Sequence, residues 1–274
     1  MAAILSAVWI SAVPAAAQGI AIVTDASGKV TGPGPITILS EIAADARLQL
    51  EPGAKLVVLY IKSGDEYTLS GPAQVQFQPG GPNVLSGAKP QKRASPVGKG
   101  GNVTIKPVGV AQAAYVMRSA RTTARIRLLT LSATRSLETS PEFRWQGIEG
   151  GTKYRFELTD DTGRSLHEAE VEDTSLKLPG SVALKEGQSY TWEVSTRTPD
   201  KRRYVSAGDF TIATAALRAQ AQALRPAASA PVSDRVAYAA WLEQAELRDE
   251  ARRYWRALAK ERPEDEKLKA LAAE

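Results

Sequence analysis

Histidine and cysteine, which often serve as nucleophiles, bases and metal ligands, are almost absent from this chain. Its 274 residues include one histidine, His167, and no cysteine. This inventory argues against a three-histidine metal site and against serine–histidine or cysteine–histidine pairs. The carboxylate pairs Asp160-Asp161 and Glu172-Asp173 fall in turn-like stretches, where aspartate is favoured for backbone reasons. Gly80-Gly81 and Gly100-Gly101 lack the Lys-Ser/Thr pair of a phosphate loop. The sequence therefore predicts a protein that is not an enzyme and has no cofactor or metal site, although a hydrolase using carboxylates alone is left open.

The strongest electrostatic feature is a stretch without acidic residues, from Tyr67 to Leu137. The positive charge of its lysines and arginines exceeds the net charge of the whole chain, which is +5. Concentrated positive charge attracts anionic partners, here an anionic lipid or polysaccharide or an acidic protein. The residues predicted for this anionic-surface binding are Lys92, Arg93, Arg118, Arg121 and Arg125. The alternative is a solvated basic loop. Tyr115 is the only aromatic residue among these charges, which argues against nucleic-acid binding.

Four tryptophans offer a different chemistry, because an exposed indole can stack on a sugar ring. Their positions match the alternation of strands or the stripes of helices, which favours packing in a core. The four are Trp145, Trp192, Trp241 and Trp255. A carbohydrate- or peptidoglycan-binding module that uses the aromatics of the central region is therefore an alternative function.

The N-terminus has the pattern of an export signal. The apolar run Ile4–Val13 is followed by Pro14 and by a small-residue cleavage pattern at 15–17. The run is too short to cross a bilayer as a helix, and no lysine or arginine precedes it. We expect residues 1–17 to be a signal peptide and the mature protein to be periplasmic or secreted, without a transmembrane span.

Residues 18–110 predict an all-β domain with a Gly/Pro/Lys-rich loop at 79–107. Short apolar runs such as Leu56–Ile61 alternate with turns such as Glu51-Pro52-Gly53 and Ser63-Gly64-Asp65. In this order of short strands and turns, the region resembles the FecR-type domain of bacterial envelope proteins. FecR-type regulators also carry a membrane helix and a cytosolic segment. A FecR-like signalling role is a further alternative, and it implies an upstream start that would add those parts.

Residues 124–213 predict a β-sandwich. Large apolar residues two apart, as at Phe143 and Trp145 or Tyr190 and Trp192, indicate strands with one buried face. We expect Ile126–Leu131 to be the leading strand. The region resembles Ig-like or fibronectin type III-like modules, a likeness that implies a fold and no particular activity.

Residues 214–274 predict a helical tail. Its helices are expected at 213–224, at 235–245 with Ser233 or Asp234 as the cap, at 249–262 and from 264 onward. Residues 233–266 resemble one tetratricopeptide repeat in the spacing of Leu242, Ala251, Trp255 and Pro263. One repeat buries its apolar face poorly, so it must pack on the preceding helix, on the sandwich or on another chain. The residues predicted to bind a partner are Tyr238, Trp241, Tyr254 and Trp255.

These features predict a mainly β protein with an α-helical C-terminus. We expect a non-enzymatic cell-envelope protein that binds or scaffolds another macromolecule, with an envelope protein docked on the helical tail.

Overall fold

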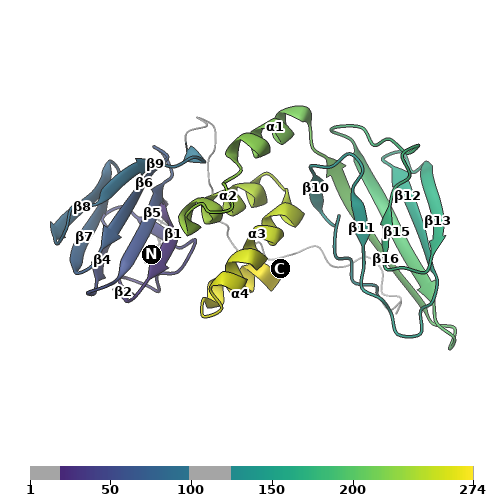
Figure 1. The fold of residues 1–274 in the computed structure, drawn as a ribbon, viewed down its shortest axis with the longest axis horizontal. Coiled ribbons are helices and arrows are strands. Elements are labelled where there is room, and N and C mark those ends of the chain that lie inside the picture. Colours follow the sequence, from purple (N-terminus) through teal and green to yellow (C-terminus); the bar gives the residue numbers. More distant parts are fainter. Residues whose placement is uncertain (1–18, 99–124, 274) are drawn as a thin grey trace, which may run out of the picture.

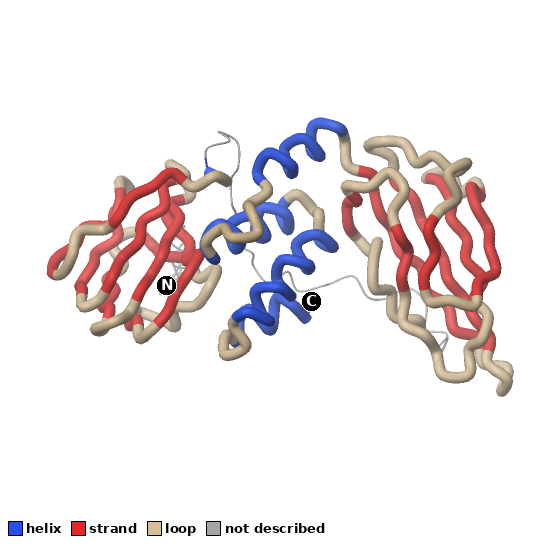
Figure 2. Tube along the Cα trace, in the orientation of Figure 1, coloured by secondary structure: helices blue, strands red, loops and turns tan. Residues whose placement is uncertain are grey.

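The computed structural model describes residues 19–98 and 125–273. Two β-domains lie at opposite ends of the molecule, and the helices lie between them (Figure 1). Strands dominate both ends, as Figure 2 shows, so the prediction of a mainly β chain with a helical C-terminal part is confirmed. The predicted signal peptide at 1–17 lies outside the described residues. No helix in the described part of the chain has the length and apolar character needed to cross a membrane.

The N-terminal domain packs two antiparallel sheets against each other. One sheet has the order β3-β1-β5-β6-β9 and the other β2-β4-β7-β8. The two sheets share one core because successive side chains of a strand point to opposite faces. Strands β4 and β7 bury every second side chain there, among them Leu48 and Phe77. The strands are β1 (Gly19–Ser27), β2 (Val30–Thr31), β3 (Glu41–Ala43), β4 (Arg47–Leu50), β5 (Lys55–Tyr60), β6 (Asp65–Ser70), β7 (Ala73–Gln78), β8 (Gly81–Ser86) and β9 (Gln91–Ala94).

The prediction of a loop at 79–107 is wrong where the structure describes that region. Strands β8 and β9 each form the edge of a sheet there, where proline and glycine are tolerated. Beyond β9, the backbone of Gly98 packs closely against Gly64, because a Cβ added to Gly98 would lie 2.4 Å from the Cα of Gly64. Val97 is 1% exposed. The glycines and prolines that suggested a linker therefore serve sheet edges and a close backbone contact.

The second domain is a sandwich of a large and a small sheet. The large sheet has the order β10-β16-β15-β12-β13, and β11 pairs with β14 in the small one. The ring of Phe143 from the small sheet lies edge-on to Phe156, Trp192 and Phe210 of the large sheet, with centroid distances of 4.9, 5.2 and 5.6 Å. The strands are β10 (Thr134–Ser136), β11 (Glu142–Arg144), β12 (Tyr154–Asp160), β13 (Ser165–Val171), β14 (Ser175–Lys177), β15 (Ser189–Arg197) and β16 (Arg203–Ile212).

The predicted leading strand at Ile126–Leu131 is wrong, since this segment forms only an isolated bridge between Leu128 and Trp145. Leu131 and Ala133 have φ angles of 55° and 51°, which turn the chain out of an extended path. The sandwich takes its edge from β10 instead, which runs parallel to the last strand, β16.

Four helices form the tail: α1 (Ala215–Leu224), α2 (Val232–Gln244), α3 (Arg248–Glu261) and α4 (Glu266–Ala273). Thr214 caps α1 by accepting a hydrogen bond from the Leu217 amide, as its hydroxyl chemistry favours. The predicted caps of the next helix are wrong, because α2 begins after Pro231 without a side-chain cap. Ser233 and Asp234 lie in its first turn and face the N-terminal domain.

The tail packs on both β-domains as well as on its own first helix. Helix α2 lies on β1 and α3 on β10. Strand β1 is buried on both faces, since Ala21 and Val23 enter the N-terminal core while Ile22 packs with the helices. Of the three packing alternatives left by the sequence, the structure shows the preceding helix and the sandwich, and it adds the N-terminal domain.

Candidate functional site

The four aromatic residues predicted to bind a partner belong to the core of the tail. Tyr238, Trp241 and Trp255 are 1%, 5% and 0% exposed, and Tyr254 is half-buried. The Tyr238 ring stacks on Trp241 and lies edge-on to Tyr254, and its hydroxyl donates to the Ala221 carbonyl at 2.8 Å. The chain's own core covers Tyr238, Trp241 and Trp255, so in this arrangement these three side chains offer almost no surface to a second protein.

Of the residues predicted for an anionic surface, the structure describes Lys92, Arg93 and Arg125. Lys92 forms an ion pair with Asp65 at 2.9 Å, and Arg93 is held by internal carboxylates. Arg125 is exposed. Arg118 and Arg121 lie outside the described residues. In the N-terminal domain, the two charges that the sequence singled out therefore serve contacts within the chain.

Arg93 joins the N-terminal domain to the tail. Its guanidinium donates to Glu66 at 2.6 Å and to both carboxylate oxygens of Asp234 at 2.7 and 3.1 Å. It also donates to the Ser233 hydroxyl at 3.1 Å. Glu66 is 1% and Asp234 6% exposed, so Arg93 compensates two carboxylates that water barely reaches.

The pKa values of this cluster show where burial dominates. Burial raises the pKa of Glu66 above its ordinary value, against the lowering effect of the Arg93 charge. The hydrogen bond to Asp234 raises the pKa of Arg93. The two shifts differ in their main cause because Glu66 is almost fully buried, whereas the Arg93 side chain is 40% exposed. Desolvation therefore falls mainly on the acid.

Further polar contacts fix the tail at both ends. Arg262 binds Asp25 of β1 at 2.6 Å. On the other side, the Glu246 carbonyl accepts from the Arg135 amide at 2.7 Å and from the Thr134 hydroxyl at 3.1 Å. These bonds, together with the shared apolar core, hold both β-domains on one helical unit.

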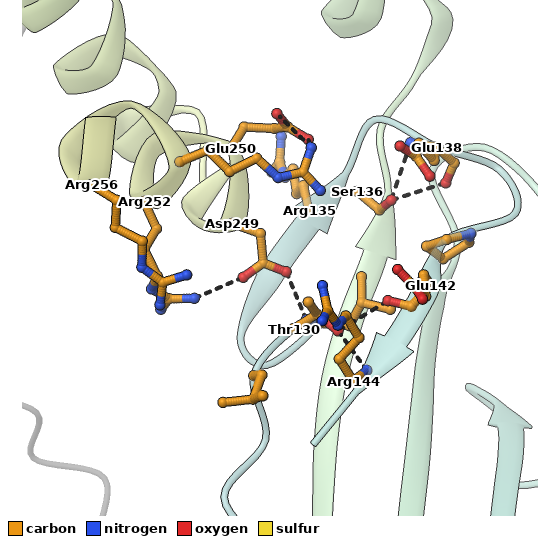
Figure 3. A pocket seen from close by; sticks show the side chains of 14 residues that line it. Thr130, Arg135, Ser136, Glu138, Glu142, Arg144, Asp249, Glu250, Arg252 and Arg256 are labelled. Atoms are coloured by element: carbon orange, nitrogen blue, oxygen red, sulfur yellow. Dashed lines mark hydrogen bonds and ion pairs between the residues drawn. The ribbon is translucent and has the colours of Figure 1, made fainter. Parts of the chain in front are cut away.

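A groove of about 420 Å³ lies along the seam between the sandwich and α3 (Figure 3). Its walls come from residues 129–144 of the sandwich and from the first turns of α3. A second hollow of about 230 Å³ continues it and shares Leu129, Thr130, Asp249, Arg252 and Arg256 with the first. We call these two hollows together the seam groove. Leu129, one of two large apolar side chains exposed in the described residues, lies on its wall.

Hydrogen bonds order both walls of the seam groove, and one of them, from the Leu131 amide to Asp249, crosses the seam. Asp249 accepts from the Leu131 amide at 2.7 Å and from Arg252 at 2.9 Å. Thr130 donates to the Glu142 carbonyl at 3.0 Å and accepts from the Arg144 amide at 2.9 Å. The walls are therefore fixed in position before any ligand arrives.

Arginine dominates the lining of the seam groove. Acidic residues accompany the arginines, and two of these pair with them directly: Glu250 with Arg253 at 3.1 Å, and Asp249 with Arg252. Burial raises the pKa of Glu250, and the Arg253 charge opposes that shift. The arginines of the two hollows are Arg127, Arg135, Arg144, Arg252, Arg253 and Arg256.

Three arginines of the seam groove have no partner for their guanidinium groups within the described chain: Arg127, Arg144 and Arg256. All three are exposed. Figure 3 shows Arg144 and Arg256 on opposite sides of Asp249, one carried by the sandwich and the other by α3. Unpaired guanidinium groups on opposed walls give the groove the capacity to bind carboxylates or phosphates.

Sequence reasoning found only part of this site. Arg127 belongs to the basic stretch, but Arg144 and Arg256 lie beyond it, and Arg256 is separated from Arg127 by the whole sandwich. No local motif links them. The exposed face of α3 was the one available signal, because its arginines are spaced to lie along one side of a helix.

The tryptophans of the sandwich are core residues. Trp145 is 1% and Trp192 0% exposed, and the Trp192 indole donates to the Leu131 carbonyl at 2.8 Å. Neither ring presents a face on which a sugar could stack, which removes the residues on which the carbohydrate alternative depended.

No family model matches the chain, and the search of curated proteins gives no match. Among solved structures, CopC from Methylosinus trichosporium OB3b is 20% identical, with 32% of this chain and 94% of CopC covered and a TM-score of 0.25. The fn3 domain of human collagen alpha-1(XX) chain is 16% identical, with 42% and 94% covered and a TM-score of 0.26. PorZ, a surface component of the type-IX secretion system of Porphyromonas gingivalis, is 10% identical, with 60% and 28% covered and a TM-score of 0.22. These likenesses are too weak to carry an argument about function.

Proposed function

We propose that this chain is a non-enzymatic scaffold of the bacterial cell envelope that binds another envelope protein at the seam groove. The observation that carries the proposal is the groove itself, whose walls belong to two different domains and are held by hydrogen bonds across the seam. A preformed, partly apolar groove with unpaired charges is typical of a binding site. Docking on the tail is kept from the sequence-based prediction, with the groove side of α3 in place of the buried aromatics.

The proposal includes export of the protein, together with the FecR-type and tetratricopeptide-like resemblances. The apolar run Ile4–Val13 with its small-residue cleavage pattern supports a signal peptide and a periplasmic or secreted location. The all-β N-terminal domain is compatible with the FecR-type resemblance, and the burial of Leu242, Ala251 and Trp255 is compatible with the tetratricopeptide-like one.

Leu129 and Leu85 provide a matched test of the proposed docking site. They are 38% and 50% exposed, but only Leu129 lines the seam groove. We expect the mature protein and the Leu85→Asp variant to capture the same protein from a detergent-solubilised envelope extract, and the Leu129→Asp variant to lose it. Quantitative mass spectrometry of the eluates measures this difference.

Equal capture by all three proteins would contradict the proposal, because an aspartate in the groove places an unpaired charge against any partner seated there. Recovery of only lipid or polysaccharide that salt removes would contradict it as well.

A further inference from the structure

We infer that the seam groove binds an acidic, extended polypeptide segment with an apolar residue between its carboxylates. This inference rests on the proposed function and names the chemistry of the partner. It follows from three properties of the groove: its unpaired arginines, their placement, and the acidic residues among them.

The unpaired arginines indicate that the ligand is negatively charged. Arg127, Arg144 and Arg256 have no carboxylate within the described chain, although Asp249 of the same groove already binds Arg252 and the Leu131 amide. Their guanidinium groups therefore have hydrogen-bond donors that an anionic ligand can use. Residues 99–124 of the same chain would be an unsuitable occupant, because their charged side chains are Lys99, Lys106, Arg118 and Arg121 and include no acid.

The placement of these arginines defines the spacing of the ligand's charges. Arg144 comes from β11 and Arg256 from α3, and Figure 3 shows them on opposite sides of Asp249. Donors that converge on one point suit a single phosphate group, whereas separated donors suit two anions carried by one chain. Leu129 lies on the wall of both hollows and offers an apolar contact for a side chain between those anions.

The acidic residues of the groove separate a polypeptide from other anions. Glu138 and Glu142 line the larger hollow together with Arg135 and Arg144. A uniformly anionic polymer or a lipid surface would meet repulsion from these carboxylates. A polypeptide has both acidic side chains for the arginines and amide donors for the carboxylates, so its mixed chemistry matches the mixed lining.

Selection from a library of short random peptides displayed on phage tests this inference. The full mature protein is the bait, and the comparison uses two double variants with the same change in charge. Arg144→Gln/Arg256→Gln removes two unpaired arginines of the groove. Arg47→Gln/Arg197→Gln is the control, because both residues are exposed arginines elsewhere on the surface that form no ion pair within the described residues. Neither double variant removes a buried contact, so both are expected to fold.

We expect peptides with two separated Asp or Glu residues to be enriched on the wild type and on the control. A synthetic copy of the most enriched peptide should bind the groove variant at least about tenfold more weakly, measured by fluorescence anisotropy at physiological salt. Enrichment without acidic residues, or equal affinity for all three proteins, would overturn the inference.

Two further probes separate other anions from a polypeptide. Vesicles of phosphatidylcholine and phosphatidylglycerol in equal parts, and inorganic phosphate, are tested on the same proteins. Arginine-dependent binding of vesicles, or displacement of the peptide by phosphate at constant ionic strength, would overturn the polypeptide assignment. Capture of an envelope protein together with a failed peptide selection would overturn this inference alone, whereas selected acidic peptides without a captured protein would count against the proposed function alone.

Discussion

Replacing Arg93 with alanine should destabilise the N-terminal domain and its contact with the tail by about 3 kcal/mol, because it leaves two buried carboxylates without their cation. Glu66 and Asp234 are 1% and 6% exposed, and Arg93 donates to both. We place the effect at the lower end of the range for buried pairs, since the Arg93 side chain is 40% exposed and water can replace part of its contacts. Denaturant unfolding followed by circular dichroism measures the loss. Lys92→Ala on the same strand is the control, because the Lys92 side chain in its ion pair with Asp65 is 54% exposed and should contribute less than about 1 kcal/mol.

The destabilisation by Arg93→Ala should also depend on pH. Burial already raises the pKa of Glu66 in the folded wild type, and removal of the arginine raises it further. A carboxyl whose pKa is higher in the folded state than in the unfolded state binds more protons when folded, so protonation favours folding. The difference between variant and wild type should therefore be largest at neutral pH and should shrink as the pH falls through the raised pKa of Glu66. A difference below about 1 kcal/mol at neutral pH, or one that grows on acidification, would contradict this role of Arg93.

Replacing Trp192 with alanine should destabilise the sandwich by about 4 kcal/mol. The indole is 0% exposed, contacts Phe143, Trp145 and Phe156, and donates to the Leu131 carbonyl at 2.8 Å. The substitution leaves a cavity and an acceptor without its donor, and both effects lower the free energy of unfolding. Circular dichroism during denaturation in guanidinium chloride measures the change.

The same variant separates core packing from glycan binding. Leu85→Ala is the control, because Leu85 is 50% exposed and its loss should change stability by less than about 0.5 kcal/mol. A Trp192→Ala protein that unfolds like the wild type but no longer binds envelope glycans would contradict the core assignment and restore the carbohydrate alternative.

Residue patterns predicted the regular elements well because the patterns are local. The alternation at Tyr190 and Trp192 corresponds to β15, and the helical pattern that includes Trp255 corresponds to α3. The predictions were wrong where glycine and proline occupy sheet edges, as at β8 and β9. They were also wrong at Ile126–Leu131, an apolar run that packs on the sandwich without forming a strand.

The site depended on contacts between distant residues, which local patterns do not contain. The aromatic residues Tyr238 and Trp241 indicated a buried helical face, but nothing nearby in the sequence indicated that Ile22 and Leu59 belong to the same apolar cluster. The apolar run within β1 is the one local pattern typical of a strand that is buried on both faces. Likewise, the placement of Arg144 and Arg256 on two walls of one groove follows from the docking of α3 on the sandwich.

We expect the helical tail to hold the two β-domains in one fixed arrangement. Because the chain has no cysteine, Gln49→Cys and Glu170→Cys introduce the only thiols, on exposed positions of β4 and β13 in opposite domains. Spin labels on this pair allow double electron–electron resonance to measure the distance between the domains. We predict one narrow distance population, no broader than the labels themselves produce. A broad or multiple distance distribution in the otherwise unchanged protein would show that the domains move independently, which would contradict this role of the tail.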